Sequence, residues 1–505
     1  MVIIVTLTLK SETFVETTIP NTTDWKAINW HKVIKYVDRM QKRIYHAQST
    51  KNYRKVRNLQ RILVNSKAIL LLAIYKVTYK NKGKRTPGID GFRALSDTKR
   101  AELFNTMKNM NIKLHNPKPA YRKYIRKKNG KLRSLGIPVI IDRIYQEIIR
   151  MALEPQAETN FEATSYGFRP KRGCHDAASR IMTTIVHGNW NWVFEGDFKS
   201  CFDTLSHSFI IEQIKSFPFY DVVEKFLKAG YVDNNIFHST EEGTPQGGII
   251  SPLLANIALN GMEKILNITY KKSTRKNGND NYDSEGDYRM VRYADDFIIL
   301  AKSRENIEKV YEILKPYLDE RGLQLAEDKT KITHLEEGFD FLGFNFRRYK
   351  TKNGYKHLYR PSKNSIKEFK LKVAEICKSC QGQSLDILID RLNPLIRGTA
   401  NYWDVSSAKR IFLNMDYYLW HKVFSFLKRL HQNKPIKWIK KKYYPPYIDE
   451  NHIDNWVPKG PKKGNRLIKM GWIPIKRYSR IQHNHSPYDK TKEQYFKNRA
   501  FCTKR

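Results

Sequence analysis

Residues 290–300 read Met-Val-Arg-Tyr-Ala-Asp-Asp-Phe-Ile-Ile-Leu, so the paired carboxylates Asp295 and Asp296 stand between two apolar runs. Neighbouring side chains on a regular strand point to opposite faces, but at a tight turn between two strands they can lie together at the tip. Two negative charges above buried apolar strands are unfavourable unless a cation neutralises them. The stretch therefore predicts a hairpin over residues 288–301 whose tip binds a cation.

A third carboxylate, Asp197, ends the apolar run Trp-Val-Phe-Glu-Gly-Asp at residues 192–197. Mg²⁺ typically takes one or two carboxylates together with substrate phosphates, and a pair of such ions can activate a 3′-hydroxyl and stabilise a leaving pyrophosphate. Asp197, Asp295 and Asp296 are therefore the predicted metal ligands and catalytic residues. Asp203 could belong to the same site, and the alternative is that it caps a helix that begins near His207.

A glycine-rich loop lies between these two acidic segments, at residues 243–252 (Gly-Thr-Pro-Gln-Gly-Gly-Ile-Ile-Ser-Pro). Its glycines let the backbone approach a ligand closely, and Gln246 can contact a base or a sugar. Glycine loops are common, so this loop alone decides little. The order in the chain of a strand-end Asp, a Pro-Gln-Gly loop and the sequence Tyr-Ala-Asp-Asp is a far more specific signal than the loop alone.

The composition points to a polyanionic partner. The 505 residues carry 92 Lys and Arg against 50 Asp and Glu, a net charge of +42, and 12% are aromatic. The aromatic content excludes a uniformly disordered tail, and the charge favours nucleic acid over a generic basic protein such as a ribosomal accessory factor. No apolar run is long enough to span a bilayer. Five scattered cysteines are too few for a disulfide framework and indicate a reducing compartment.

In this order the motifs resemble those of reverse transcriptases, most closely the reverse transcriptase–maturases encoded in group II introns. The resemblance covers nearly the whole chain. Residues 86–91 (Thr-Pro-Gly-Ile-Asp-Gly) resemble the family's N-terminal extension motif, and residues 131–138 and 165–170 its two finger motifs. Residues 322–331 resemble a palm motif, residues 341–344 the primer-gripping hairpin, and residues 396–403 the thumb and maturase region.

The resemblance implies an α+β fold of the right-hand polymerase type. Fingers and a palm with an antiparallel sheet would be followed by an α-helical thumb/maturase domain and a basic C-terminal extension. The expected domains are an N-terminal extension with basic helices (1–110), fingers and palm (111–355), thumb/maturase (356–433) and a basic nucleic-acid-binding extension (434–505). Many relatives continue into an HNH endonuclease with paired Cys-x-x-Cys motifs, and no complete one is expected here. Cys377 and Cys380 have that spacing without a second pair, which favours ordinary thiols over a zinc site.

The resemblance also implies roles for single residues. Phe202 matches the aromatic gate that excludes a ribose 2′-hydroxyl, and Arg133 and Lys127 would neutralise the incoming triphosphate, although Lys127 could equally be a solvated charge. The full set expected to bind the deoxynucleotide is Lys127, Arg133, Phe198, Phe202, Gln246 and Lys329. The expected primer grip is Phe341, Leu342 and Gly343.

RNA binding is expected from Arg397, Tyr402 and Trp403 in the helical region and from Lys440, Lys441 and Lys442 in the basic extension. In residues 434–480 lysines and arginines alternate with tryptophans. Cations bind phosphates without sequence preference and aromatic rings stack on unpaired bases. The alternative is a solvated charge run with tryptophans buried in a core.

The expected function is DNA synthesis on an RNA template, from a DNA primer or target, with Mg²⁺ and deoxynucleoside triphosphates. The expected second activity is to bind the parent group II intron RNA and to assist its splicing and mobility. Such a ribonucleoprotein would be cytoplasmic in a bacterium or archaeon, or belong to an organelle that encodes its own copy, with no membrane association. One rival is an RNA-binding splicing factor with a vestigial palm, which the intact aspartates disfavour. Another is a reverse transcriptase used in host defence, which the maturase-like helices disfavour.

Overall fold

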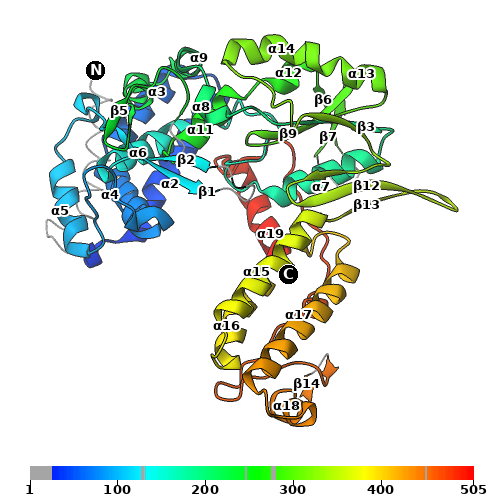
Figure 1. The fold of residues 1–505 in the computed structure, drawn as a ribbon. Coiled ribbons are helices and arrows are strands. Elements are labelled where there is room, and N and C mark those ends of the chain that lie inside the picture. Colours follow the sequence, from blue (N-terminus) through cyan, green and yellow to red (C-terminus); the bar gives the residue numbers. More distant parts are fainter. Residues whose placement is uncertain are drawn as a thin grey trace.

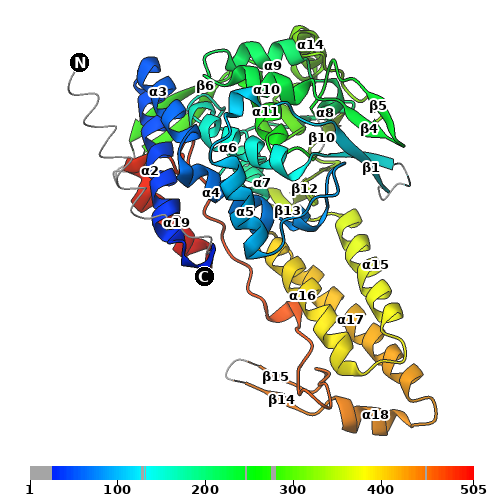
Figure 2. The ribbon, with the colours of Figure 1, turned by 90° about the vertical axis from the view of Figure 1, so that its left-hand side faces the viewer.

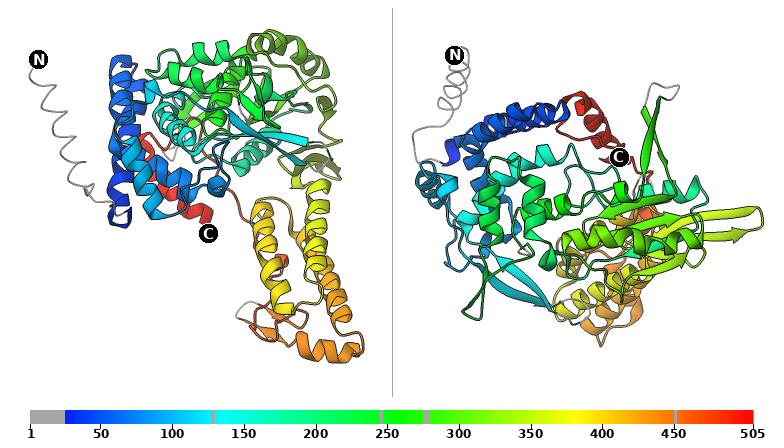
Figure 3. Two further views of the ribbon diagram at one scale, coloured as in Figure 1. Left: turned by 60° about the vertical axis from the view of Figure 1, so that its left-hand side comes forward. Right: turned by 90° about the horizontal axis from the view of Figure 1, so that it is seen from above.

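The structure is a computed structural model that describes residues 25–126, 130, 132–244, 247–274, 280–449 and 452–504. A broad body of helices and sheets carries a helical arm that projects from one side (Figure 1). The left view of Figure 3 shows the arm set off from the body, and the right view looks down on the body from above. The architecture is the α+β right-hand arrangement expected from the sequence.

A layer of N-terminal helices packs on α6 (Ile140–Ala157) at one side of the body (Figure 2). Apolar side chains such as Ile44, Leu63 and Ile69 are fully buried between these helices, while basic side chains such as Lys35 and Arg39 are exposed. Asn29 and Asn52 cap the first two helices by accepting hydrogen bonds from backbone N–H groups. The helices and helical turns of this layer are η1 (Trp25–Ala27), α2 (Trp30–Ser49), α3 (Tyr53–Val64), α4 (Lys67–Tyr75), η2 (Lys76–Lys80), η3 (Lys82–Arg85), α5 (Asp97–Met107) and η4 (Ile112–Leu114).

A four-stranded sheet forms the fingers, in the order β2-β1-β4-β5. Strands β1 (Ala120–Arg126) and β2 (Leu132–Ile137) are antiparallel and pair Ile125 with Arg133. Strands β4 (Tyr231–Asp233) and β5 (Ile236–His238) extend the sheet on the other side of β1.

The palm is a second four-stranded sheet, fully antiparallel, in the order β10-β3-β9-β8. Its strands are β10 (Lys331–His334), β3 (Trp192–Gly196), β9 (Asp296–Ala301) and β8 (Tyr288–Tyr293). Alternate side chains enter two different hydrophobic cores: Phe297 and Ile299 face the core of the N-terminal helices, and Ile298 and Leu300 face the core shared with the arm. Burial on both faces explains why β9 is an unbroken apolar run.

Helices cover both faces of the palm and connect it to the fingers. Helix α7 (Cys174–Val186) packs on β8, and α13 (Arg304–Glu308) packs on β3 and β9. The other elements of the body are α8 (Cys201–Thr204), α9 (His207–Ile214), α10 (Tyr220–Leu227), α11 (Ser251–Ala258), α12 (Met262–Ile265) and α14 (Val310–Arg321), with a two-stranded hairpin of β6 (Thr269–Thr274) and β7 (Asp280–Glu285).

A three-stranded sheet, β11 (Phe339–Phe341), β12 (Phe344–Thr351) and β13 (Gly354–Pro361), leads from the palm into the arm. The arm is built from α15 (Lys363–Ser379), α16 (Leu385–Trp403) and α17 (Lys409–Leu430), with α18 (Ile436–Tyr443) and the short strands β14 (Tyr447–Ile448) and β15 (Ile453–Asp454) at its tip (Figure 1).

The last part of the chain returns to the body. After η5 (Met470–Trp472) it runs back along the arm, passes η6 (Lys490–Lys492) and ends in α19 (Glu493–Lys504), which lies beside the N-terminal helices (Figure 2). The buried carboxylate of Asp176 on α7 receives this segment: it accepts hydrogen bonds from Ile481 N at 2.7 Å, Tyr478 Oη at 3.3 Å and Arg499 Nη2 at 2.6 Å. The described residues between 434 and 504 therefore form two structural parts, one at the arm tip and one docked on the palm, where the sequence suggested a single extension.

Among the described residues no single helix has the length and hydropathy needed to cross a membrane. Helix α3 together with residues 67–80 meets those requirements only as a pair bent by 63°.

Candidate active site

The predicted carboxylates meet at one end of the palm sheet. Strands β3 and β9 pair Gly196 with Phe297, and this register brings Asp197 level with Asp296. The two-residue turn between β8 and β9 holds Asp295, and its first residue, Ala294, has a left-handed φ of 59°. Asp197 and Asp295 are half-buried and Asp296 is exposed. The hairpin predicted over residues 288–301 is confirmed.

The loop at residues 164–168 packs against β8 and against this turn. Tyr166 N donates to Arg292 O at 2.9 Å, and Arg292 N donates to Thr164 O at 3.0 Å, so the loop runs alongside β8. A Cβ on Gly167 would lie 2.3 Å from Ala294 N, so only glycine fits there. The sequence resemblance assigned this stretch to the fingers, and its glycine is the signal that could have placed it against the turn between β8 and β9.

A buried arginine on β8, which the sequence motifs do not single out, also holds this turn in place. Arg292 is fully buried, and its Nη1 donates to Ala294 O and to Asn256 Oδ1, each at 3.2 Å. The Ala294 carbonyl immediately precedes Asp295. Arg292 therefore fixes the backbone that presents the Asp295 carboxylate.

The carboxylates repel one another and two cations partly compensate them. Burial and then the charge of Asp197 raise the pKa of Asp295, while Arg133 and Lys329 lower it. Partial burial, followed by the charges of Asp295 and Asp197, raises the pKa of Asp296 to about 6. Lys329 Nζ is ion-paired with Asp197 Oδ2, and this hydrogen bond is the main cause of the raised pKa of Lys329. The site therefore carries a surplus of negative charge that a divalent cation would relieve.

The residues present fit a hard divalent cation. Within the described parts of the chain, no three His, Cys, Asp or Glu side chains converge closely enough to hold a metal ion by themselves. Mg²⁺ does not require this, because it is usually held by one or two carboxylates and completes its shell with water and substrate phosphate oxygens. Asp197 and Asp295 supply that oxygen set, in line with the divalent metal that reverse transcriptases generally use.

Phe202 and the glycine loop lie next to the carboxylates. Phe202 on α8 is 9% exposed, and its carbonyl accepts a hydrogen bond from Thr244 N at 2.6 Å. A cavity of about 300 Å³ lies between Phe202, Thr244 and the finger strands. A Cβ on Gly247 would lie 2.5 Å from Gly136 O, so this glycine lets the loop touch β2. Arg133 is exposed on β2, and its charge reaches Asp295.

Three of the predicted nucleotide-binding residues are either outside the described residues or buried. Lys127 and Gln246 lie outside the described residues. Phe198 is 3% exposed and its ring packs 5.0 Å from that of Phe297. This ring is therefore part of the core beneath the palm sheet, and a nucleotide contact at Phe198 stays a prediction.

The predicted primer grip forms a tight hairpin tied to the arm. Phe341 pairs with Phe344, and the two turn residues both have left-handed backbones, with φ of 48° at Leu342 and 77° at Gly343. Leu342 O accepts a hydrogen bond from Tyr402 Oη at 2.8 Å, and Gly343 O accepts one from Ser365 Oγ at 2.9 Å. Helices α15 and α16 thus hold this turn by its backbone.

The predicted RNA-binding residues divide into exposed and buried sets. Trp403 is 2% exposed in the arm core, so the expectation that it contacts RNA is wrong. Tyr402 is half-buried, with its hydroxyl on Leu342 and its ring 5.2 Å from that of Phe344, and it joins the grip to the arm. The remaining four side chains are exposed: Arg397, Lys440, Lys441 and Lys442. Lys440 Nζ lies 4.2 Å from the ring centre of Trp456, a cation–π contact.

Comparison with known proteins agrees with this arrangement. Residues 125–346 match the family model "Reverse transcriptase (RNA-dependent DNA polymerase)", residues 25–107 match "N-terminal domain of reverse transcriptase", and residues 366–444 match "Group II intron, maturase-specific domain".

Two bacterial proteins are clear relatives. Protein YkfC of Escherichia coli is 33% identical over 63% of this chain and 90% of its own. The group II intron-encoded protein LtrA of Lactococcus lactis is 31% identical over 70% of this chain and 72% of its own. A telomerase structure from Candida albicans aligns with 65% of this chain and 62% of its own, with a TM-score of 0.36 and 12% identity. From its motifs, its fold and these relatives, the chain belongs to the reverse transcriptase–maturase family of group II introns.

Proposed function

We propose that this RNA-directed DNA polymerase, which also assists the splicing and mobility of a group II intron, carries out DNA synthesis at the Asp197, Asp295 and Asp296 site with Mg²⁺ and deoxynucleoside triphosphates. The observation that carries this proposal is the meeting of three carboxylates from β3 and the β8–β9 turn at one sheet edge, partly neutralised by Lys329.

Each residue of the site has a task in this reaction. Asp197 and Asp295 would hold Mg²⁺, and the bound ion would lower the pKa of the primer 3′-hydroxyl and stabilise the charge on the transferring phosphate. Arg133 approaches the triphosphate from the fingers, and Phe202 lies under the sugar, where a 2′-hydroxyl would collide with its ring. The Leu342-Gly343 turn holds the primer, because the arm fixes its backbone.

The arm and the N-terminal helices supply the RNA-binding surfaces in this proposal. Arg397, Lys440, Lys441 and Lys442 are exposed along the arm, and exposed lysines and arginines cover the outer side of α2. Such cations bind phosphates with little sequence preference, so we assign them to the intron RNA and to the template and primer strands. The complex would form where the intron is transcribed, in the cytoplasm of a bacterium or archaeon or in an organelle.

Primer extension on an RNA template tests the catalytic assignment. Asp295→Ala should lower the rate constant by at least about 10²–10³-fold, the scale of loss when a group that stabilises the transition state is removed. Asp319→Ala is the matched control, because Asp319 is an exposed carboxylate on α14. Equal activity in the wild-type and Asp295→Ala proteins would contradict the proposal and favour a splicing factor with a vestigial palm.

A further inference from the structure

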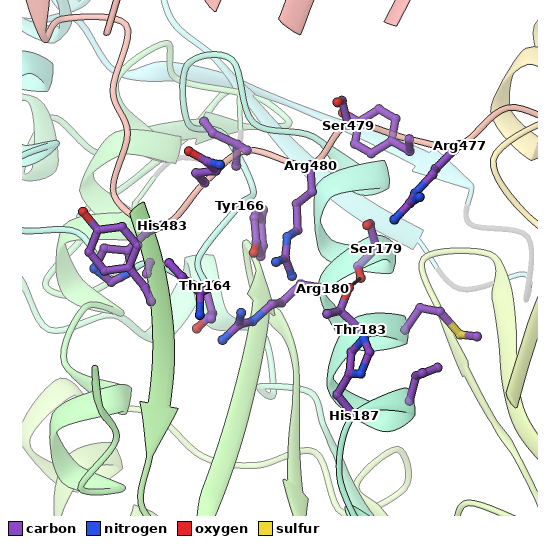
Figure 4. Close-up of a pocket in the computed structure, with 18 of the residues that line it drawn as sticks. Thr164, Tyr166, Ser179, Arg180, Thr183, His187, Arg477, Ser479, Arg480 and His483 are labelled. Atoms are coloured by element: carbon purple, nitrogen blue, oxygen red, sulfur yellow. Dashed lines mark hydrogen bonds between the residues drawn. The ribbon is translucent and has the colours of Figure 1, made fainter. Parts of the chain in front are cut away.

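A cavity of about 710 Å³ lies away from the carboxylate site, between α7, the β6–β7 hairpin and the returning C-terminal segment. We refer to it as the arginine cavity, because Arg180, Arg477 and Arg480 line it. Figure 4 shows Arg180 entering from α7 and Arg480 from the C-terminal segment, with Arg477 nearby and the hydroxyls of Ser179 and Ser479 around them. Arg477 is exposed, and Arg180 and Arg480 are half-buried.

Among the described residues, none of the three guanidinium groups forms an ion pair with a carboxylate; the charge of Asp176 does act on Arg480, but Asp176 is itself paired with Arg499 at 2.6 Å. Asp280 is the carboxylate among the lining residues, and its Oδ2 is 3.1 Å from Lys272 Nζ, which neutralises it. The Nη1 atom of Arg480 is buried without a hydrogen-bond partner. Burial lowers the pKa of Arg480, and the neighbouring charge of Arg180 adds to this effect.

Gathering cations in a partly desolvated cavity is unfavourable unless an anion enters it. Guanidinium groups bind phosphate in a bidentate manner and are the preferred protein partners of phosphate groups. A cavity of this volume is in the range that holds a small ligand, about 300–1,000 Å³. Aromatic walls are present as well, since the His483 ring stacks on Tyr282 at 4.1 Å and contacts Tyr270 at 4.7 Å.

We propose that the arginine cavity binds a phosphate group of a nucleotide, and that this nucleotide belongs to the backbone of an RNA strand. The choice of RNA as the source rests on the proposed function, whereas the phosphate itself rests on the three unpaired guanidinium groups. Arg477 is exposed at the rim, where the strand continues out of the cavity. Since Arg180 and Arg480 come from segments 300 residues apart, a bound phosphate also joins the C-terminal segment to the palm.

The salt dependence of RNA binding gives the first test. Binding of a fluorescein-labelled single-stranded RNA to the full-length protein is measured at several salt concentrations. Each lost phosphate contact lowers the slope of log K against log salt by about 0.7, so the double variant Arg180→Gln/Arg480→Gln, which loses the one phosphate in the cavity, should lower it by about 0.7. The matched control is Arg304→Gln/Lys309→Gln, on α13 and at the residue directly after it, which removes the same charge from residues already paired with Glu308 and Glu305 and should leave the slope unchanged.

Photocrosslinking locates the contact. Single-stranded RNA that contains 4-thiouridine should crosslink to the peptides that carry Tyr270, Tyr282 or Tyr478 in the wild type, and the double variant should lose these crosslinks. Crosslinks from free 4-thiouridine monophosphate but not from the RNA would overturn RNA as the source. An unchanged slope together with no crosslinks from either probe would overturn the site itself.

Two further variants keep the result interpretable. Arg477→Gln changes an exposed side chain, so it should fold even where the double variant does not, and it should lower the slope by about 0.7. Asp295→Ala should abolish primer extension and leave the crosslinks intact. The double variant should retain primer extension on a short template. Primer extension therefore tests the active-site assignment, and the crosslinks and the salt slope test the cavity assignment, so the two can fail separately.

Discussion

At the scale of single residues, the palm contains a buried carboxyl group, that of Glu162, whose pKa is raised toward neutral pH. Glu162 is 9% exposed, and burial followed by the charge of Glu263 raises the pKa of Glu162 to about 7, although Arg292 opposes the shift. Its Oε1 accepts hydrogen bonds from the N–H groups of Gly261 and Glu263, whereas its Oε2 is buried without a partner. The native protein therefore binds a proton here that the unfolded chain has released above pH 4.5.

We expect Glu162→Gln to stabilise the protein at alkaline pH. Because the native state binds more protons than the unfolded state between pH 4.5 and about 7, wild-type stability falls as pH rises through this window. Glutamine imitates the protonated form, so the variant should be more stable by about 1–3 kcal/mol at pH 8 and nearly equal at pH 4.5. Thermal unfolding of both proteins from pH 4.5 to 8 measures this, and a constant difference across the range would contradict the assignment.

Lys329 offers a second prediction at this scale. Its ammonium group competes with a cation for Asp197, so Lys329→Met should lower the Mg²⁺ concentration that gives half-maximal primer extension. Lys329 is 57% exposed, and an exposed pair contributes up to about 1 kcal/mol, which corresponds to a change of about twofold to fivefold. The control is Lys331→Met, since Lys331 is paired with Glu195 at 3.2 Å and should leave the Mg²⁺ dependence unchanged. A higher Mg²⁺ requirement in Lys329→Met would show that the lysine does not compete.

At the scale of single elements, the grip hairpin depends on a glycine for two reasons. Gly343 has a φ of 77°, and a Cβ on it would lie 2.9 Å from Ser365 Oγ on α15. Gly382 in the arm has a similar φ of 79° with open space around it. Substitutions at these two positions therefore distinguish the cost of a left-handed backbone, which applies to both glycines, from the cost of crowding, which applies to Gly343.

We expect Gly382→Ala to destabilise the protein by about 1–2 kcal/mol through the left-handed backbone alone. Gly343→Ala should destabilise it more, and it should also raise the KM for primer, because the turn is pushed away from α15. Thermal unfolding and primer-extension kinetics check both effects. Equal losses of stability with an unchanged KM would mean that Ser365 moves aside and that the turn does not hold the primer.

The elements that the sequence predicted best are those with a local pattern. The two apolar runs on either side of Asp295 and Asp296 identified the β8–β9 hairpin, and the strand that precedes Asp197 was equally clear. Motif resemblance identified the positions of Phe198 and Trp403 but not their burial, since burial is decided by helices and strands far away in the chain. The only sequence signal for the Gly167 contact is the glycine itself, and the C-terminal return could not be predicted, because it is a contact between segments without a shared pattern.

At the scale of the whole molecule, the C-terminal segment is held to the palm through Asp176, which is 1% exposed. Asp176→Asn removes the charge that pairs with Arg499 and leaves a poorer acceptor for Ile481 N. We expect the segment from residue 476 to residue 500 to be released more often. Breaking a buried pair in this way costs about 3–5 kcal/mol.

Limited trypsin digestion measures the release, because the segment contains several lysines and arginines. Asp176→Asn should be cleaved there faster than the wild type, while Asp390→Asn, which alters an exposed carboxylate paired with Lys463, should be cleaved at the wild-type rate. Identical digestion of all three proteins would mean that other contacts hold the segment.

The palm sheet separates two hydrophobic cores, and this has a consequence for how the protein opens. A single strand such as β9 contributes Phe297 to one core and Ile298 to the other, so neither core can come apart while the strand keeps its place. Amide hydrogens of β3 and β9 should consequently exchange with solvent at one common slow rate, which only complete denaturation sets. The scaffold of the active site would then be the last region to lose its order when the protein is heated.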